Sequence, residues 1–194
     1  MKRICVFAGS SAGTRPAYAE AARSLAGELV ARKLGVVYGG GQVGLIGVLA
    51  DTALALGGEV IGVIPRPLAS RELAHPGLSE LRLVGSMHER KATMASLVDG
   101  FIALPGGLGT FEETLEVLTW AQLGIHRKPV GVLSAEGYFN GLLGLLSYAV
   151  REGFVRPEYF ALLLSAATPA DLLDRFAAWR PPAFPRAWLD PTQA

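Results

Sequence analysis

The chain contains the stretch FIALPGGLGTFEE at residues 101–113, and this stretch decides the fold class. Its first four residues form an apolar run typical of a buried strand, and a glycine-rich turn follows at once. We expect a helix from Phe111, with Thr110 as its N-cap, Glu113 completing a capping box, and two carboxylates in the first turn. Glycines let backbone N–H groups converge, and a helix N-terminus adds partial positive charge. The stretch therefore predicts a phosphate-binding loop between a strand and a helix.

Short apolar runs alternate with longer segments of helical composition along the whole chain. The predicted strands are 4–7, 36–38, 60–64, 81–84, 101–104, 130–133 and a weaker candidate at 162–164. The predicted helices are 17–32, 45–56, 88–97, 111–122, 138–151 and 170–179, with Thr168 and Pro169 starting the last one. Continuous apolar strands separated by helices are typical of parallel sheets covered on both faces. We predict an α/β fold, a single doubly wound Rossmann-like domain with a mostly parallel sheet at residues 1–180, and a proline-containing tail at 181–194.

Three of the predicted strands end in loops that contain glycine. These loops are Gly9-Ser10-Ser11, Gly39-Gly40-Gly41 and Gly106-Gly107. Ligands of doubly wound folds bind beyond the carboxyl ends of the strands. We therefore expect the three loops to converge on one edge of the sheet and to form the binding site there.

The composition excludes several classes of function. The 194 residues are 51% hydrophobic and 18% charged, and a net charge of +1 favours neither nucleic acid nor a membrane surface as partner. Cys5 is the only cysteine, which excludes a disulfide framework and fits a reducing cytoplasm. No apolar run approaches the roughly 20 residues that span a bilayer. The three histidines lack metal-ligand spacing, so we expect no metal. We also expect a cytoplasmic protein that needs no cofactor.

Residues 39–44, GGGQVG, match the dinucleotide-binding pattern G-x-G-x-x-G, and Glu59 follows at about the spacing of a ribose-binding acid. That pattern should follow the first strand, whereas this match follows the second. Glu59 also precedes a predicted strand, while the ribose acid normally ends one. A tight turn packed against the sheet is the favoured interpretation, and a dinucleotide-dependent oxidoreductase remains the weaker alternative.

A second motif, SMHERKATM at residues 86–94, places two adjacent cations at the start of a helix. Cations there oppose the helix dipole. Arg90 and Lys91 point about 100° apart on a helix, so only one of them faces any given ligand group. The pattern fits either a ligand-facing pair or a solvated charged surface.

Taken together, PGGLGTFEE at 105–113, MHERK at 87–91 and TWAQLGIH at 119–126 resemble the Lonely guy (LOG) family of cytokinin riboside 5′-monophosphate phosphoribohydrolases. The similarity runs from Ile4 to about Phe154 and leaves out the tail. Ala8 departs from the family, which often has cysteine in the first loop.

The resemblance implies a Rossmann-like homodimer that cleaves the N-glycosidic bond of AMP or N6-substituted AMP to the free base and ribose 5-phosphate. It implies that Arg90 and Glu113 are catalytic. The implied substrate contacts are Glu80, Arg90, Lys91, Gly106, Gly107, Leu108, Gly109, Thr110, Phe111, Glu112 and Thr119. Relatives have been labelled lysine decarboxylases, but the phosphate loop here has no lysine for pyridoxal phosphate. The alternative on the same scaffold is a non-catalytic carrier of a nucleotide or of the molybdenum cofactor.

Overall fold

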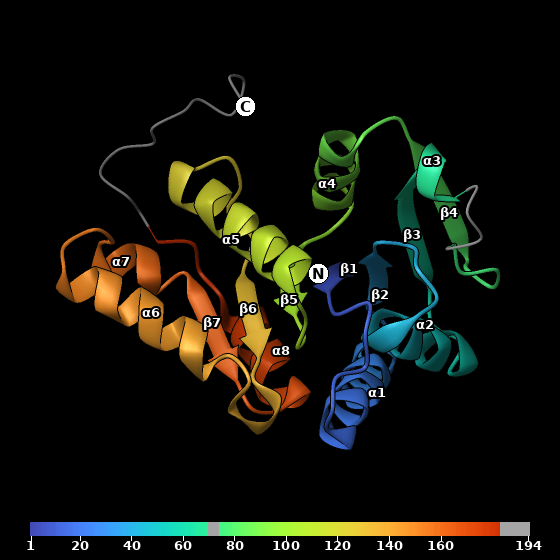
Figure 1. The fold of residues 1–194 in the computed structure, drawn as a ribbon, viewed down its shortest axis with the longest axis horizontal. Coiled ribbons are helices and arrows are strands. Elements are labelled where there is room, and N and C mark those ends of the chain that lie inside the picture. The colour runs from blue at the N-terminus through green and yellow to red at the C-terminus, as the bar shows by residue number, and fades with distance from the viewer. Residues whose placement is uncertain (70–73, 183–194) are drawn as a thin grey trace.

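The computed structural model describes residues 1–69 and 74–182, which form one seven-stranded sheet in the order β4-β3-β2-β1-β5-β6-β7 (Figure 1). Every pair of neighbouring strands is parallel. The strands are β1 (Arg3–Phe7), β2 (Gly35–Tyr38), β3 (Val60–Pro65), β4 (Glu80–Val84), β5 (Gly100–Ala103), β6 (Val130–Leu133) and β7 (Leu163–Ala166). The predicted α/β fold is confirmed, and the weaker strand candidate at 162–164 is the edge strand β7.

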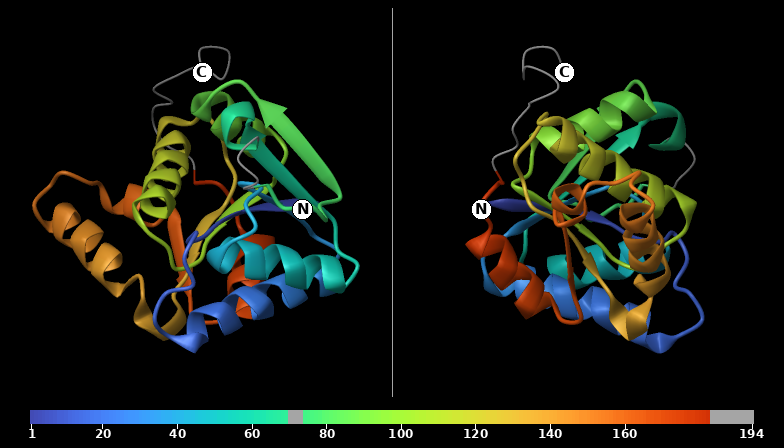
Figure 2. Two further views of the ribbon diagram at one scale, coloured as in Figure 1. Left: turned by 45° about the vertical axis from the view of Figure 1, so that its right-hand side comes forward. Right: turned by 90° about the vertical axis from the view of Figure 1, so that its left-hand side faces the viewer.

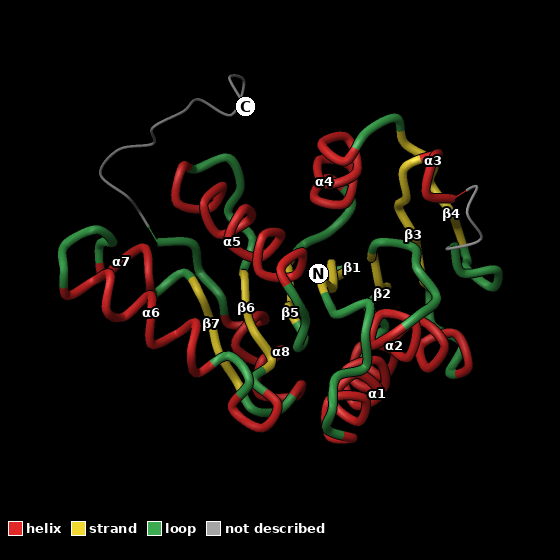
Figure 3. Tube along the Cα trace, in the orientation of Figure 1, coloured by secondary structure: helices red, strands yellow, loops and turns green. Residues whose placement is uncertain are grey.

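Helices cover both faces of the sheet (Figure 2). The first layer consists of α1 (Pro16–Ala31), α2 (Gly44–Ala55) and α8 (Pro169–Ala178). The second consists of α4 (Met87–Ser96), α5 (Leu108–Leu123) and α6 (Asn140–Arg151). Figure 3 also shows the connections, some of which contain short helices that the sequence did not predict. These are α3 (Arg66–Leu68), η2 (Ala135–Gly137) and α7 (Pro157–Phe160).

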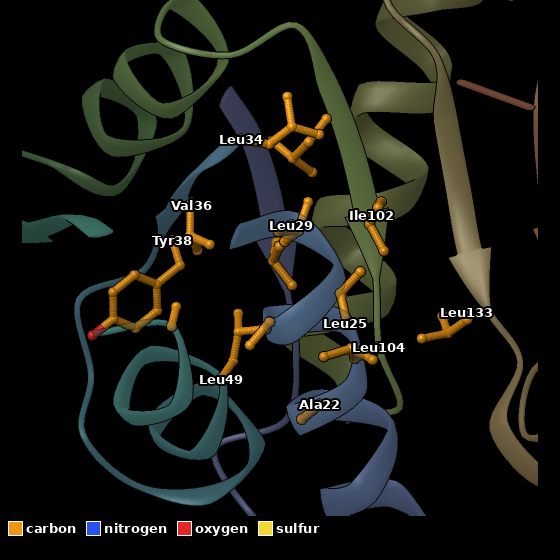
Figure 4. Close-up of a cluster of buried hydrophobic side chains, with 14 of the residues drawn as sticks. Ala22, Leu25, Leu29, Leu34, Val36, Tyr38, Leu49, Ile102, Leu104 and Leu133 are labelled. Atoms are coloured by element: carbon orange, nitrogen blue, oxygen red, sulfur yellow. The ribbon is translucent and has the colours of Figure 1, made fainter. Parts of the chain in front are cut away.

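Side chains of each central strand alternate between the two layers. In β1, Ile4 and Val6 pack in the first layer, whereas Cys5 and Phe7 pack in the second. This period of two explains why the strands are apolar throughout, since both of their faces are buried. Figure 4 shows the first layer, where side chains of α1 and α2 meet those of β2 and β5. Each fully buried leucine or isoleucine there stabilises the fold by about 1.5–3 kcal/mol.

Two helix starts illustrate how well local sequence signals predict structure. The Thr168 hydroxyl accepts a hydrogen bond from the Asp171 N–H at 3.3 Å, so the predicted cap of the last helix is confirmed. Ser86 is the N-cap of α4, and its hydroxyl accepts a hydrogen bond from the Glu89 N–H. The Glu89 carboxylate accepts one from the Gly85 N–H at 2.6 Å. The pattern S-x-x-E at 86–89 was the available signal for this second cap.

The order of the strands reverses between β1 and β5, which are neighbours although they are distant in sequence. Such a switch point opens a crevice at the carboxyl ends of the two strands. Of the predicted tail, residues 183–194 lie outside the described part of the chain.

Candidate active site

The three glycine-bearing loops meet at the switch point, as predicted. The Gly9 N–H donates to the Pro105 carbonyl at 3.0 Å, which joins the loops after β1 and β5. The Leu45 N–H donates to the Gly9 carbonyl at 2.9 Å, which joins the start of α2 to the same loop. The prediction that the three glycine-bearing loops converge at the carboxyl ends of the strands is therefore confirmed.

Gly106 has to be glycine because its neighbours leave no space for a side chain. A Cβ atom on Gly106 would lie 2.1 Å from the Thr110 hydroxyl oxygen and 2.8 Å from the Gly9 nitrogen. Next to this contact is a hollow of about 300 Å³, lined by Ser10, Ser11, Tyr18, Gly107 and Tyr138 among others. This volume is at the lower end of the range for small-molecule sites.

The start of α5 differs from the prediction. The helix begins at Leu108, with Gly107 as an N-cap that offers no side chain, and Thr110 lies inside the helix. The predicted capping box of Thr110 and Glu113 is therefore wrong, and Glu112 and Glu113 lie in the second turn rather than the first. Thr110 is buried under the glycine loop, where the absent Cβ of Gly106 makes room for its hydroxyl. Among the described residues, no side chain caps the N–H groups of the first turn, and these groups can therefore bind an anion.

Arg90 of α4 and Glu113 of α5 form an ion pair beside these loops. A guanidinium nitrogen of Arg90 lies 3.2 Å from a carboxylate oxygen of Glu113, and the two side chains are only 16% and 13% exposed. The Arg90 Nε–H also donates to the carbonyl of Val63, within β3, at 3.2 Å. Gly39 makes this position possible, because a Cβ there would lie 2.2 Å from Arg90 Nη2. The third glycine-bearing loop thus provides the surface on which the guanidinium rests.

The environment of Glu113 favours its protonated form more than water does. Burial raises the pKa of the Glu113 carboxyl, and the nearby Arg90 guanidinium opposes this by stabilising the carboxylate. A buried carboxylate with a raised pKa is a stronger base than an exposed one. The pair therefore fits a general base or a group that stabilises a developing positive charge.

Lys91 points to different partners, as expected for adjacent residues on a helix. Its ammonium lies 2.6 Å from Glu112 and 2.9 Å from Glu116, both on α5. Burial alone lowers the pKa of Lys91, but the hydrogen bonds to these carboxylates outweigh burial and raise it. The alternative of a solvated charged surface is wrong for this pair, because Arg90 and Lys91 are both largely buried.

Two of the predicted substrate contacts lie apart from the ion pair. Glu80 is at the amino end of the edge strand β4, where its carboxylate pairs with Arg82 at 2.7 Å. Thr119 is exposed on α5, and its hydroxyl donates to the Leu115 carbonyl. The described chain does not bring these two residues to the glycine loops, and their contact with substrate stays a prediction.

Glu59, the acid of the dinucleotide alternative, lies at the amino ends of the strands, opposite the glycine loops. It forms two hydrogen bonds with the Arg3 guanidinium, at 2.7 and 2.8 Å, just before β3 begins. Glycine loops at the carboxyl ends and an acid at the amino ends cannot hold one ribose. This placement removes the basis of the dinucleotide alternative.

Sequence reasoning missed Tyr138, which follows η2. Its hydroxyl donates to the Gly106 carbonyl, and its ring lines the hollow beside the glycine loop. A single tyrosine after a turn carries no pattern that distinguishes it from other aromatic residues. Only the structure shows that this residue reaches the loop.

Within the described residues, no helix combines the length and apolar character needed to cross a bilayer. The same part of the chain contains no group of three or more histidine, cysteine, aspartate or glutamate side chains suited to a metal ion.

Comparison with known proteins decides the family. A family model described as "Possible lysine decarboxylase" matches residues 46–176. Cytokinin riboside 5′-monophosphate phosphoribohydrolase LOG7 of Arabidopsis thaliana is 51% identical over 180 residues, which is 93% of this chain and 83% of that protein. The chain belongs to the LOG family. A second LOG protein of Arabidopsis thaliana, LOG5, is 49% identical over 93% of this chain and 79% of its own length.

Solved structures of more distantly related proteins have a similar fold. The molybdenum cofactor carrier protein of Chlamydomonas reinhardtii has a TM-score of 0.69 and 20% identity over 92% of this chain and 99% of that chain. The molybdenum cofactor binding protein of Rippkaea orientalis has a TM-score of 0.68, also with 20% identity, over 92% of this chain and 97% of that chain. At this identity the likeness concerns the fold alone.

Proposed function

We propose that this LOG-family chain hydrolyses the N-glycosidic bond of AMP and of N6-substituted AMP, the cytokinin riboside 5′-monophosphates. The products are the free base and ribose 5-phosphate. The observation that carries the proposal is the buried Arg90–Glu113 pair beside a glycine loop and an uncapped helix start. The names of the relatives that are about 50% identical support the same reaction.

The spacing along α5 fits a ribose 5-phosphate. At 1.5 Å per residue, Glu113 lies about 9 Å along the helix axis from Gly107, and helical side chains lean toward the N-terminus. A phosphate held by the first-turn amides therefore leaves the sugar within reach of the Glu113 carboxylate. Binding of the phosphate positions C1′ without taking part in the bond that breaks.

In the proposed reaction, the C1′–N9 bond breaks and its electron pair goes to the base. A water oxygen bonds to C1′, Glu113 accepts one proton from this water, and the departing base takes up a proton from solvent to become neutral. Glu113 then returns its proton to solvent, so the net proton passes from the water to the base. The transition state carries positive charge at the sugar, by analogy with glycosidases, and a buried carboxylate stabilises it. Base catalysis of this kind contributes about 10²–10⁴-fold. Arg90 orients Glu113 through their ion pair.

We further propose that the protein is a cytoplasmic homodimer and that the second copy covers the outer face of α5. Leu108 and Leu115 lie on this face, 86% and 36% exposed. In the sequence, Leu115, Leu118 and Trp120 share a helix with Glu113 and provide more apolar surface than one contact with the sheet needs. In the structure, Leu118 and Trp120 are partly buried against the chain's own core. The exposed apolar surface that supports the proposed interface therefore consists of Leu108 and Leu115.

One assay tests the reaction directly. The protein is incubated with AMP, N6-isopentenyl-AMP, adenosine and other nucleoside monophosphates, and free base and ribose 5-phosphate are quantified. Release of both products in equal amounts from AMP or its N6-substituted form is expected. Binding of a nucleotide without release of base would favour the non-catalytic carrier instead.

A further inference from the structure

Tyr138 links the β6–α6 connection to the glycine loop in front of α5. Its hydroxyl donates a hydrogen bond to the Gly106 carbonyl. Its ring stacks on Phe111 of α5, with centroids 6.3 Å apart and planes 12° apart, and meets the ring of Tyr18 edge-on at 5.6 Å. Tyr138 thus contacts both the loop and the fourth residue of the helix that follows it.

The connection before Tyr138 has an unusual backbone that fixes the direction of this side chain. Glu136 and Gly137 both have positive φ values, 52° and 70°. A left-handed conformation at a residue other than glycine is uncommon and persists where the surroundings enforce it. Here the Ser134 hydroxyl accepts from the Phe139 N–H at 3.2 Å, and the Phe139 side chain is fully buried. Anchoring of Phe139 in the core leaves Tyr138 directed at the loop.

The hydrogen bond to Gly106 determines how the next amide is presented. A trans peptide is planar, so the Gly106 carbonyl and the Gly107 N–H point in opposite directions. Holding the carbonyl at Tyr138 therefore directs the Gly107 N–H away from the tyrosine. Glycines on both sides of this peptide provide no steric barrier to its rotation. Without the hydroxyl, the peptide can turn and aim a carbonyl oxygen at a bound anion.

We propose that Tyr138 is a positioning residue for the phosphate of the substrate, acting through the Gly106–Gly107 peptide. This inference rests on the proposed function, because it assumes that the loop binds the 5′-phosphate. Beyond that function, the inference assigns a role to the β6–α6 connection: its Tyr138 hydroxyl keeps the Gly107 N–H in the orientation that binds phosphate.

The test compares ligands that differ in the phosphate. The affinities of the wild-type and Tyr138→Phe proteins for ribose 5-phosphate and for adenine are measured by calorimetry, together with melting temperatures. The phenylalanine keeps the ring contacts, so the melting temperature is expected to stay close to that of the wild type. Affinity for ribose 5-phosphate is expected to fall about tenfold, as for the loss of one hydrogen bond, while affinity for adenine is unchanged.

Two further variants separate the hydroxyl from other effects. Tyr148→Phe removes a hydroxyl from an exposed tyrosine of α6 and is expected to change neither affinity. Tyr138→Leu removes ring and hydroxyl together, so a loss confined to this variant would assign the effect to ring packing and overturn the proposal. Equal affinity of wild-type and Tyr138→Phe for ribose 5-phosphate would overturn it too, as would equal losses for both ligands. A wild type that binds ribose 5-phosphate but releases no base from AMP contradicts only the proposed hydrolysis, and the affinity ratio still decides the role of Tyr138.

Discussion

The Arg90 guanidinium lies 3.2 Å from the Glu113 carboxylate, across the gap between α4 and α5. The two residues come from two of the three motifs that resemble the family, and the fold brings them together beside the switch point of the sheet. The pair is buried, so both charges depend on each other for stabilisation. Changing either residue, or the glycine against which Arg90 packs, should therefore affect activity strongly.

Phosphate dependence follows from the uncapped amides at the start of α5. We expect AMP to be cleaved with a kcat/KM at least about a hundredfold above that of adenosine, because adenosine cannot use the binding energy of the loop. The measurement is release of adenine from each substrate under identical conditions. Equal kcat/KM values would show that the loop does not hold a phosphate during the reaction.

Gly39→Ala should reduce activity although it adds only a methyl group. The new Cβ would lie 2.2 Å from Arg90 Nη2, so the guanidinium has to move away from its position beside Glu113. We expect kcat/KM for AMP to fall about 10–100-fold. The matched control is Gly141→Ala on α6, where a Cβ meets nothing within 4 Å and full activity is expected. Unchanged activity of the Gly39 variant would argue against a fixed position of Arg90.

The acid–base behaviour of Glu113 can be measured directly. Burial raises its pKa, so a ¹³C NMR titration of the free protein should place this carboxyl above about 4.3, the usual glutamate value. Because the folded state binds this proton more tightly than the unfolded chain, Glu113 favours folding at acid pH. That contribution is lost as the pH rises through the folded pKa. A midpoint at or below the usual value would contradict the described environment.

The proposed dimer predicts a specific effect of charge on α5. Leu115→Arg should convert a dimer into a monomer, because it places a charge in the proposed interface. Leu56→Arg, an exposed leucine at the end of α2 in the other layer, serves as the control and should leave the dimer intact. Light scattering reports the mass of each protein. A monomeric wild type at assay concentration would exclude the proposed assembly.

The sequence predicted the sheet and the meeting of its loops because apolar runs and glycines are local signals. The predicted start of α5 was wrong because the two glycines of Gly107-Leu108-Gly109 have poor helix propensity. In the structure, Gly106 packs closely against Gly9 and Thr110, and this packing places the helix start at Leu108. Distances between helices have no local signal, so the contact of Lys91 with Glu116 could not be predicted. Tyr138 was missed for the same reason.

The central claim is that Glu113 is the catalytic carboxylate, and Glu113→Gln tests it most directly. Because Glu113 does not cap α5, this change removes charge and basicity without removing a helix cap. Turnover of AMP is measured for the wild type, for Glu113→Gln and for Glu20→Gln, which alters an exposed carboxylate of α1 as the control. We expect Glu113→Gln to melt within a few degrees of the wild type and to lose at least about a hundredfold in kcat, while Glu20→Gln keeps full activity. Near-native turnover of a folded Glu113→Gln protein would contradict the account.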